Sequence, residues 1–392
     1  MARRNTPADL SAAIIGLIGT RGPQSRADLA RALDVSAAAV TNLTRQLLAD
    51  GVLTSVGTSS SGGGRPATLL DIRQGRRRAL GVKVTPNHLF MAEVDLTGDP
   101  AQAVSVDLDT RAPDALDVIA ETIADYAAPN SDLLLGVGMA VPGTVDGGVV
   151  TSPGMGWQRV DVARLVRQRV GLPVVIDNNV NALAIAGQLY GRPGLGPDSL
   201  LITIGFGIGA AIVSRGQLFR GAFGGAGEFG HIWVDPHGEP CACGLSGCLE
   251  TLVSDDALAR RAQETGAIPD GGSKDDLNEA ARAGEQRALE VFATAGFHLG
   301  AAVSSLVHVL DPGEVHVSGE GVDVWEFWEP SFMKALRAHL PAHRRDLRVT
   351  VDDWAEDAWA HGAASLVFAS PFSSSRNNTV DEVRDLLRTP QQ

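Results

Sequence analysis

Long hydrophobic runs are missing from this 392-residue sequence. It has no run of eighteen or more apolar residues, so the sequence predicts no membrane-spanning helix. The first residues, MARRNTPADL, carry charge but no apolar segment of the kind that a secretory signal needs. Cysteine is scarce, with three residues in the whole chain. Together these absences predict a cytoplasmic protein, in which cysteines stay reduced and able to bind a metal.

Lysine and glutamate are absent from the first 78 residues, yet this segment is the basic part of the chain. Its eleven arginines and five aspartates give a net charge of +6, whereas the remainder carries 22 basic and 41 acidic residues, a net charge of −19. The total of −13 would by itself argue against a nucleic-acid partner. A basic segment attached to an acidic body instead suggests a nucleic-acid-binding module joined to a domain with another task.

Two short helices are predicted in the basic segment, after a first helical pattern over residues 9–20. Ser25 is placed to cap one of them, and Ser36 to cap a second helix that ends at Gly51. Such a pair with a short turn between its members predicts a helix-turn-helix, whose second helix would lie in the major groove of DNA. The same shape can also be only a packing unit within a helical domain.

A wing is predicted after the second helix, because the strand-like patterns VLTSV and ATLLDI enclose the tip GTSSSGGGRP. We therefore expect a winged helix-turn-helix domain over residues 1–75, and the wing and the positive charge favour DNA binding. Arg65 on the tip could enter a minor groove, where negative potential is concentrated. The outward residues of the second helix are the candidates for base readout, with the strongest donors and acceptors on the last two. They are Ala37, Ala38, Thr41, Asn42 and Arg45.

Strand and helix patterns alternate from residue 79 onward, which is typical of a mixed α/β fold. Three strands are predicted over 81–108, a helix at about 113–128, and long helices at about 254–265 and 275–310. We expect a first lobe over 79–181 and a second lobe over 182–370, the latter with the dimer interface. A mobile tail with a short amphipathic helix is expected over 371–392.

The three cysteines all lie within eight residues, as Cys241, Cys243 and Cys248 in the run CACGLSGC. Three thiols and one imidazole suit a closed tetrahedral zinc site, and glycines allow the backbone to wrap around an ion. His231 and His237 are both placed to supply the imidazole, and spacing alone does not choose between them. A disulfide is disfavoured because the cysteine count is odd and the Cys-x-Cys pair is too close for an easy bridge.

The run Glu-x-Gly-His at 228–231, followed by Cys-x-Cys-Gly-x-x-Gly-Cys-Leu-Glu at 241–250, resembles the signature of the ROK family of repressors, open reading frames and kinases. The resemblance covers nearly the whole chain. Within the family, the chain is similar to the group of xylose and N-acetylglucosamine repressors. It implies a two-lobed actin-like, ribonuclease-H-like domain after the winged head. It also implies Zn²⁺ on His231, Cys241, Cys243 and Cys248. A sugar is implied on Asn178, Glu228, His231 and Glu250.

Four motifs that the family's sugar kinases need are altered here. The altered positions are Lys83, Thr85, Asn87, Asn179, Phe206 and Glu320. Asn179 stands where the kinases have the Asp that acts as general base, and an amide cannot take a proton from a sugar hydroxyl near neutral pH. Phe206 replaces the hydroxyl of a Gly-Thr-Gly-x-Gly phosphate turn, and Glu320 interrupts a Gly-Gly pair near the adenosine. The resemblance therefore implies a chain without kinase activity.

These observations predict a sugar-responsive DNA-binding transcriptional regulator of carbohydrate metabolism, acting as a repressor. We expect a homodimer or a dimer of dimers on a double-stranded operator with an inverted repeat, and a sugar between the lobes that alters the spacing of two heads. One alternative is an ATP-dependent sugar kinase of the same family with a DNA-binding head, against which Lys83 and Asn179 argue. Another is a scaffold without a ligand, against which the intact Glu228, His231 and Glu250 argue.

Overall fold

The computed structural model describes residues 7–59, 66–73, 78–98, 100–191, 194–352 and 357–369. The chain divides into two compact units, one made of residues 1–194 with 357–392 and the other of residues 195–356. The tail helix expected beyond residue 370 and the wing residue Arg65 lie outside the described residues.

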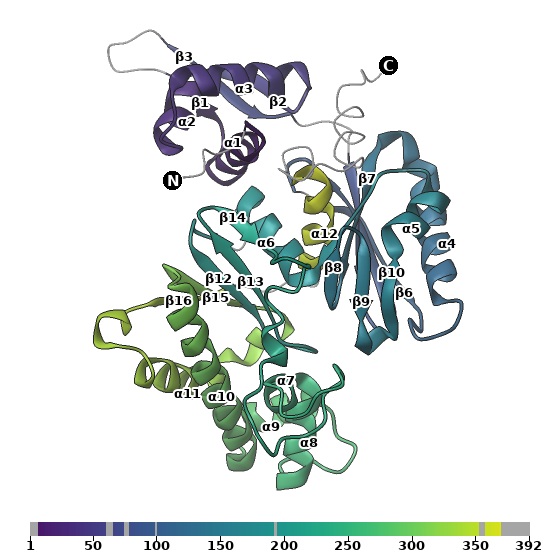
Figure 1. The fold of residues 1–392 in the computed structure, drawn as a ribbon, viewed down its shortest axis with the longest axis vertical. Helices are drawn as coiled ribbons and strands as arrows, with labels where there is room; N and C mark the ends of the chain where they lie inside the picture. Colours follow the sequence, from purple (N-terminus) through teal and green to yellow (C-terminus); the bar gives the residue numbers. More distant parts are fainter. Residues whose placement is uncertain are drawn as a thin grey trace. The chain divides into compact units, whose positions relative to one another are not determined.

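The N-terminal head is a helix-turn-helix with a small sheet of order β1-β3-β2 (Figure 1). Ser25 and Ser36 cap the two helices as predicted, each accepting from a backbone N–H three residues on, at 3.2 Å. Gly51, with φ +72°, ends α3, and the next residue, Val52, donates back to the Leu47 carbonyl at 2.9 Å. The elements are α1 (Pro7–Arg21), β1 (Gln24–Ser25), α2 (Arg26–Ala32), α3 (Ala37–Ala49), β2 (Leu53–Ser59) and β3 (Ala67–Ile72).

The rest of the first unit is built on a five-stranded sheet of order β11-β7-β4-β5-β6. Its strands are β4 (Arg78–Val84), β5 (His88–Asp95), β6 (Pro100–Asp107), β7 (Leu134–Val141) and β11 (Val174–Asn178). A smaller sheet consists of β8 (Thr144–Asp146), β9 (Val149–Ser152) and β10 (Trp157–Asp161). The helices are α4 (Ala115–Ala127), α5 (Val162–Val170), α6 (Asn179–Tyr190) and α12 (Ala358–Ala369).

Alternation along β4 explains how helices cover both faces of this sheet. Leu80 and Val82 point into a core shared with α4 and α5. Gly81 lies on the other face, where a β-carbon would overlap the backbone of α12 at Ala360. The sheet glycines thus let α12 approach the strands closely, beside α6 (Figure 1).

The second unit repeats this topology in its own sheet, of order β14-β13-β12-β15-β16. In both sheets three antiparallel strands come first in the chain, and two parallel strands follow on the side of the first one. The strands are β12 (Ser199–Thr203), β13 (Gly209–Ser214), β14 (Gln217–Phe219), β15 (Glu314–Ser318) and β16 (Arg348–Val351). The helices are α7 (Glu250–Val253), α8 (Asp255–Thr265), α9 (Lys274–Arg282), α10 (Gln286–Leu310) and α11 (Trp325–Ala338).

The long helix α10 forms the centre of the second core. Among the described residues it is the one helix long and apolar enough, by length and composition, to cross a membrane. Phe292, Leu299 and Val303 are completely buried in the core that α10 forms with α11 and the sheet. The buried apolar residues of α10 thus pack within this unit, whereas Phe297 and Val309 of the same helix are exposed.

The observed division differs from the predicted lobes at both ends of the second lobe. Residues 182–194 and 357–369 were assigned to that lobe, but they belong to the first unit. The physical reason is that α6 and α12 pack against each other, and Gly362 of α12 lies against the backbone of Ala182 and Leu183. The chain thus passes into the second unit near residue 195 and returns near residue 357.

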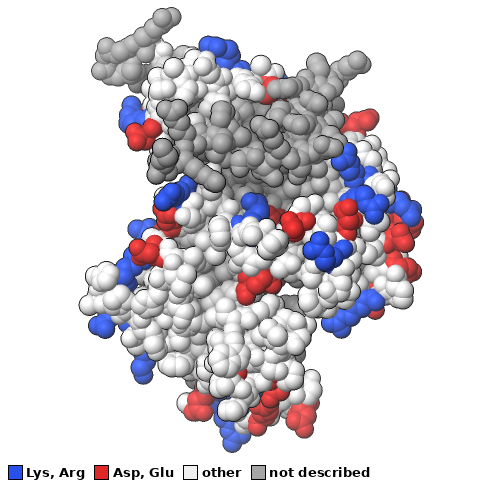
Figure 2. Space-filling view, viewed as in Figure 1, with Lys and Arg blue, Asp and Glu red and all other residues white. Residues whose placement is uncertain are grey.

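Surface charges on the visible face of the two units are mixed in sign (Figure 2). On α5, Arg169 pairs with Glu121 of α4 at 2.7 Å, and on α8, Arg261 pairs with Glu264 at 3.2 Å. Such exposed pairs keep the surface soluble but add little stability.

Candidate metal centre and ligand site

The structure brings the four predicted metal ligands together. One donor atom from each of His231, Cys241, Cys243 and Cys248 lies within 4.8 Å of all the others. His231 Nδ1 is 3.5 Å from Cys241 Sγ, and the Sγ atoms of Cys243 and Cys248 are 3.7 Å apart. His237, which spacing left as the alternative, is exposed and donates its backbone N–H to Asp235.

Backbone turns place these donors. The 3₁₀ turn Phe229–His231 leads directly into Trp233, which bridges to Cys248, so the histidine is folded back over the thiols. Gly247 has φ +75°, and a β-carbon there would overlap the Asp235 carbonyl. The Cys241 N–H donates to Leu245 across the loop at 2.7 Å. Glycine at 247 is thus required by both the turn and the close approach.

The donor set fits a tetrahedral metal ion. With metal–sulfur bonds of about 2.3 Å, the ligand atoms of such a site are about 3.5–3.8 Å apart, as the two observed distances are. Burial first, and then the neighbouring thiols, raise the pKa of Cys248 to about 12, and burial also raises the pKa of Cys241. Without a cation the thiols would therefore keep their protons, and a bound cation would displace them.

His231 connects this cluster to an acidic site. While Nδ1 faces the thiols, Nε2 lies 3.9 Å from a carboxylate oxygen of Glu228. Burial is the main reason that the pKa of Glu228 is raised; nearby Glu250 raises it too, and His231 lowers it. The imidazole thus has one nitrogen for a metal and the other on the side of the Glu228 carboxylate, an arrangement suited to hydroxyl groups of a ligand.

Glu250, the first residue of α7, is held by the glycine-rich turn after β12. One carboxylate oxygen accepts from the Ile208 N–H at 3.1 Å. β-Carbons at Gly207 and Gly230 would each lie 3.1 Å from the same oxygen, so both glycines make room for it. Part of the role of Glu250 is therefore structural, because it fixes the turn that contains Phe206.

Asn178 belongs to the first unit, whereas the other three predicted sugar ligands belong to the second. Its side chain caps α6, accepting from the Val180 N–H at 2.8 Å, and donates to the Gly143 carbonyl at 2.9 Å. Asp177, buried beside it, accepts from the Asn181 side chain at 2.9 Å. Asn178 thus joins the start of α6 to the loop after β7.

The predicted DNA-reading face of α3 is largely exposed. Ala37, Ala38, Asn42 and Arg45 are exposed, whereas Thr41 is half-buried and donates to the Ala37 carbonyl at 2.7 Å. Arg45 lies 3.4 Å from the Asn42 side-chain oxygen. Sequence reasoning missed the bond from Arg26 to buried Thr44, at 2.8 Å, which ties α2 to α3.

Acidic side chains surround the turn that would correspond to a phosphate-binding turn. A β-carbon at Gly205 would lie 2.5 Å from a carboxylate oxygen of Glu320, and Phe206 is 62% exposed. Asp255 donates its N–H to the Gly205 carbonyl, and its side chain pairs with Lys274 at 3.4 Å. Burial first, with Glu320 adding, raises the pKa of Asp255 despite this lysine. A phosphate here would lie next to the carboxylates of Glu320 and Asp255, and like charges repel each other.

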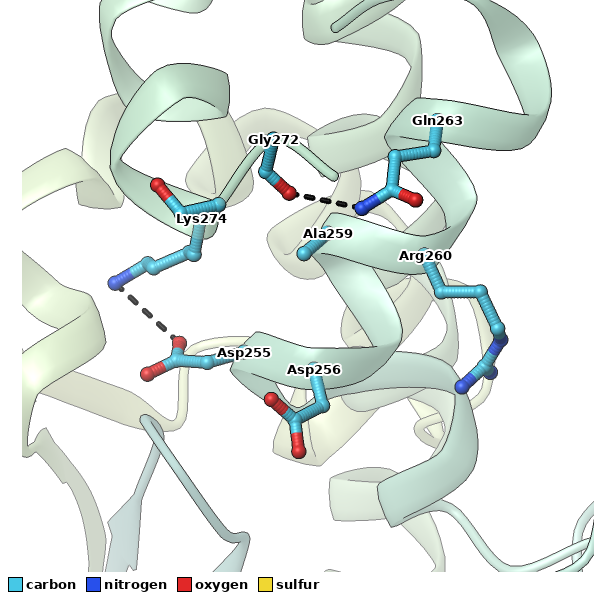
Figure 3. A pocket seen from close by; sticks show the side chains of 8 residues that line it. Asp255, Asp256, Ala259, Arg260, Gln263, Gly272 and Lys274 are labelled. Carbon is cyan, nitrogen blue, oxygen red and sulfur yellow. Dashed lines mark hydrogen bonds and ion pairs between the residues drawn. The ribbon is translucent and has the colours of Figure 1, made fainter. Parts of the chain in front are cut away.

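An open pocket, which the sequence did not predict, lies beside these residues at the starts of α8 and α9. Figure 3 shows Lys274 reaching towards Asp255, with Asp256 and Arg260 at the rim. Gln263 donates to the Gly272 carbonyl at 2.8 Å and ties the α8–α9 connection to α8. The half-buried Lys274 of the pocket is thus engaged by a carboxylate of the same pocket.

Lys83 occupies the first of the altered positions in the first unit. Its ammonium lies 4.4 Å from the ring centre of Trp359 on α12, a cation–π contact. Two residues on, the Thr85 hydroxyl accepts from the His88 N–H at 3.1 Å and closes the turn between β4 and β5. Trp157, the first residue of β10, is buried and donates to the Thr110 carbonyl at 3.2 Å.

Comparison with known proteins finds a matching family and relatives that are named as transcriptional regulators. The model of the ROK family matches residues 80–370. The DNA-binding transcriptional dual regulator NagC of Escherichia coli (strain K12) is 28% identical over 360 residues, which cover 86% of this chain and 88% of NagC. The xylose repressor of Caldicellulosiruptor bescii is 27% identical over 375 residues, covering 89% of this chain and 92% of the repressor.

Solved structures agree with this assignment and with the expected two-lobed fold. A ROK family transcriptional regulator, described as a homologue of the E. coli MLC protein, superposes with a TM-score of 0.75 at 26% identity and covers 97% of this chain and 98% of its own. A ROK family glucokinase from Streptomyces griseus, in complex with glucose and AMPPNP, gives 0.66 at 30% identity and covers 74% of this chain and 98% of its own. The chain belongs to the ROK family.

Proposed function

We propose that this chain is a sugar-responsive DNA-binding transcriptional regulator of carbohydrate metabolism, which acts as a repressor in the cytoplasm and has no kinase activity. The observation that carries the proposal is the presence, in one chain, of an exposed α3 face and of a His231–Glu228 pair whose histidine also belongs to a cluster of four potential metal ligands. Relatives that match along both parts are named as a xylose repressor and as the regulator NagC.

Zinc is the metal that the donor set favours, because three thiolates and one imidazole match its usual structural ligands. His231, Cys241, Cys243 and Cys248 would hold it. Its contribution would be to fix the loop over residues 231–248 and to set the tautomer and direction of His231. Because four protein atoms would fill its coordination positions, the ion would not bind the sugar directly.

A sugar would bind through Glu228, His231 and Glu250 of the second unit, with Asn178 of the first. Carboxylates and an oriented imidazole nitrogen accept hydrogen bonds from sugar hydroxyls. The half-buried Glu228 supports this role, since a desolvated carboxylate forms stronger hydrogen bonds than one in water. A sugar shifts the conformation of the chain only if it binds two arrangements with different affinity.

Double-stranded DNA would be contacted by α3 and by Arg65 of the wing. In a homodimer or a dimer of dimers, two heads would meet an inverted repeat with half-sites about 10 bp apart or a multiple of that spacing. Exposed Asn42 and Arg45 support base readout, because their side chains match adenine and guanine edges.

The runner-up function is that of a sugar kinase with a DNA-binding head, and the likeness to the glucokinase favours it at the level of fold. Asn179 in place of a base, and the carboxylates of Glu320 and Asp255 around Gly205, support the regulator instead. An assay for ADP release distinguishes the two functions, because only a kinase would release ADP when sugar and ATP are present.

A two-step experiment tests the proposed function. A thermal-shift screen against sugars and sugar phosphates, D-xylose and N-acetylglucosamine included, should give at least one hit among the neutral sugars. Each hit is then added to a mobility-shift assay on a duplex that the protein has enriched from a random pool. A hit that changes the fraction of bound duplex supports the proposal, and a chain that selects no duplex refutes it.

A further inference from the structure

The DNA-binding head is not a separately packed domain, because its helix α1 shares a hydrophobic core with α6 and α12 of the same unit. Ile14, Ile15 and Ile18 of α1 are buried in one cluster with Leu189 of α6 and with Val367 and Phe368 of α12. The same cluster includes Leu29, Val40 and Leu47 of the helix-turn-helix. One continuous core therefore joins the DNA-reading helix to the body of the protein.

Two glycines of α1 make this junction closer than ordinary side-chain packing allows. A β-carbon at Gly16 would lie 2.5 Å from the Gln188 carbonyl oxygen, and one at Gly19 would overlap the Leu189 carbonyl. Both carbonyls belong to the last turn of α6, which ends at Gly191 with φ +71°. Backbone meets backbone here, so a shift of the end of α6 cannot be absorbed by the rotation of a side chain.

The opposite end of α6 begins after Asn178, one of the proposed sugar ligands. Asn178 caps it and bonds to Gly143, as described above. Between its ends α6 is almost wholly buried, with Ala182, Ala184 and Ala186 completely covered. Gly362 of α12 touches its backbone at Ala182 and Leu183, with β-carbon distances of 3.0 Å. A helix of this length spans about 18 Å and moves as one body when it is packed in this way.

We propose that α6 couples the sugar site to the DNA-binding head, through Asn178 at its start and through the Gly16 and Gly19 contacts at its end. This inference rests on the proposed function, since it needs both a sugar and an operator. A ligand that changes how Asn178 and the loop at Gly143 are held shifts α6, and α6 carries α1 with it. The orientation of α3 then changes because it lies in the same core.

Gly19→Ala is the variant that tests the coupling, and Gly154→Ala is its matched control. Gly154 has no atom within 4 Å of a built β-carbon and no positive φ, so alanine fits there without a shift. Sugar affinity is measured by calorimetry with D-xylose and N-acetylglucosamine, and DNA affinity by fluorescence anisotropy on the enriched duplex. In the wild type we expect the sugar to change DNA affinity by at least about 5-fold.

Gly19→Ala should keep the sugar affinity within about 2-fold while the change in DNA affinity falls to nearly 1-fold, well below the usual range for coupled sites. Gly154→Ala should keep both. A wild-type response that Gly19→Ala retains overturns the coupling and leaves the proposed function standing, whereas a wild type without any response overturns both.

Hydrogen exchange of the unmodified protein decides the matter if Gly19→Ala does not fold. We expect saturating sugar to change the protection of amides over residues 14–21 as well as over residues 179–190. A change confined to 179–190, or the absence of a change in both segments, overturns the proposed coupling.

Discussion

At the scale of single residues, His231 is the point where two kinds of chemistry meet. One ring nitrogen lies against Cys241 and the other against Glu228, so a change at either side reaches the other. Sequence spacing could not choose between His231 and His237. The choice depends on the turn Phe229–His231 folding back over Cys248, a long-range contact that no local pattern encodes.

Cys243→Ser should remove the metal and destabilise the second unit, because one hydroxyl cannot replace a thiolate in the cluster. Elemental analysis should find about one zinc per wild-type chain and well under one in the variant. Ser246→Ala, in the same loop but outside the cluster, is the matched control and should keep its metal. A wild-type protein purified without chelators and found free of zinc would contradict the proposed cofactor.

Glu228→Ala should shift the response to much higher sugar concentrations and leave DNA binding in place, because Glu228 lies in the second unit and the head in the first. Losing a charged hydrogen-bond acceptor should weaken sugar binding by about 2–3 kcal/mol, roughly 30- to 150-fold. Calorimetry gives the affinity, and Glu239→Ala, an exposed residue of the metal loop, controls for loss of charge. Equal affinity in the Glu228 variant and the wild type would refute the assignment.

His316 makes the stability of the second unit depend on pH. Burial is the largest single influence and disfavours its charge, but Asp352 at 3.1 Å and Glu314 at 3.4 Å together outweigh burial, and the pKa is raised. Protonation therefore stabilises the folded state. This contribution is complete below about pH 6.5, the ordinary value for histidine, and is lost as the pH rises through the raised pKa.

Urea unfolding between pH 5.5 and 9 measures this contribution as a difference between the wild type and His316→Gln. The comparison is needed because burial lowers the pKa of His298, whose contribution has the opposite sign. The stability advantage of the wild type should shrink as the pH rises above about 6.5. A difference that stays constant over this range would contradict the role of the His316 proton.

At the scale of elements, local sequence signals were sufficient to predict helix ends, which depend on hydrogen bonds to nearby backbone groups. Ser25, Ser36 and Gly51 marked the ends of α2 and α3, since caps and left-handed glycines are local devices. The boundaries of the lobes were not predictable in this way. α12 is apolar on nearly every side. Its sequence therefore does not show that it packs on α6 and β4, and not on β16, the strand that precedes it in the chain.

Arg45→Ala should relax discrimination at one base pair and cost about 1–3 kcal/mol, because the proposed bidentate contact of Arg45 to a base edge would be lost. Affinity for the enriched duplex and for its single-base variants measures both effects. Arg261→Ala, an exposed arginine on α8 of the other unit, should change neither. Uniform weakening over all base variants would instead assign Arg45 to the phosphate backbone.

At the scale of the whole molecule, the fold is shared with a ROK family glucokinase, so the proposed absence of kinase activity would have to lie in single side chains and not in the fold. Phosphoryl transfer needs a general base and a site that neutralises the γ-phosphate. Asn179 removes the first, and the carboxylates of Glu320 and Asp255 oppose the second. The sequence marked Asn179 and Glu320 as altered positions, but it did not show that Glu320 lies directly against Gly205.

Asn179→Asp should therefore not restore sugar kinase activity. A restored base is worth about 10²- to 10⁴-fold in rate, but only where a nucleotide is bound. A coupled assay for ADP release, with millimolar ATP and the sugars of the thermal screen, should detect no turnover above the wild-type background. Robust turnover would show that the nucleotide half of the site is intact.

The contact of α1 with the end of α6 limits how such a protein can acquire new operators. A head that was joined to the body by a flexible linker alone could be exchanged for the head of a relative without changes in the body. Here an exchanged head needs residues without β-carbons at positions 16 and 19, and an apolar face to cover Leu189 and Phe368. In this chain a new DNA-binding head is therefore compatible with the existing ligand-binding body only if its first helix fits against the end of α6.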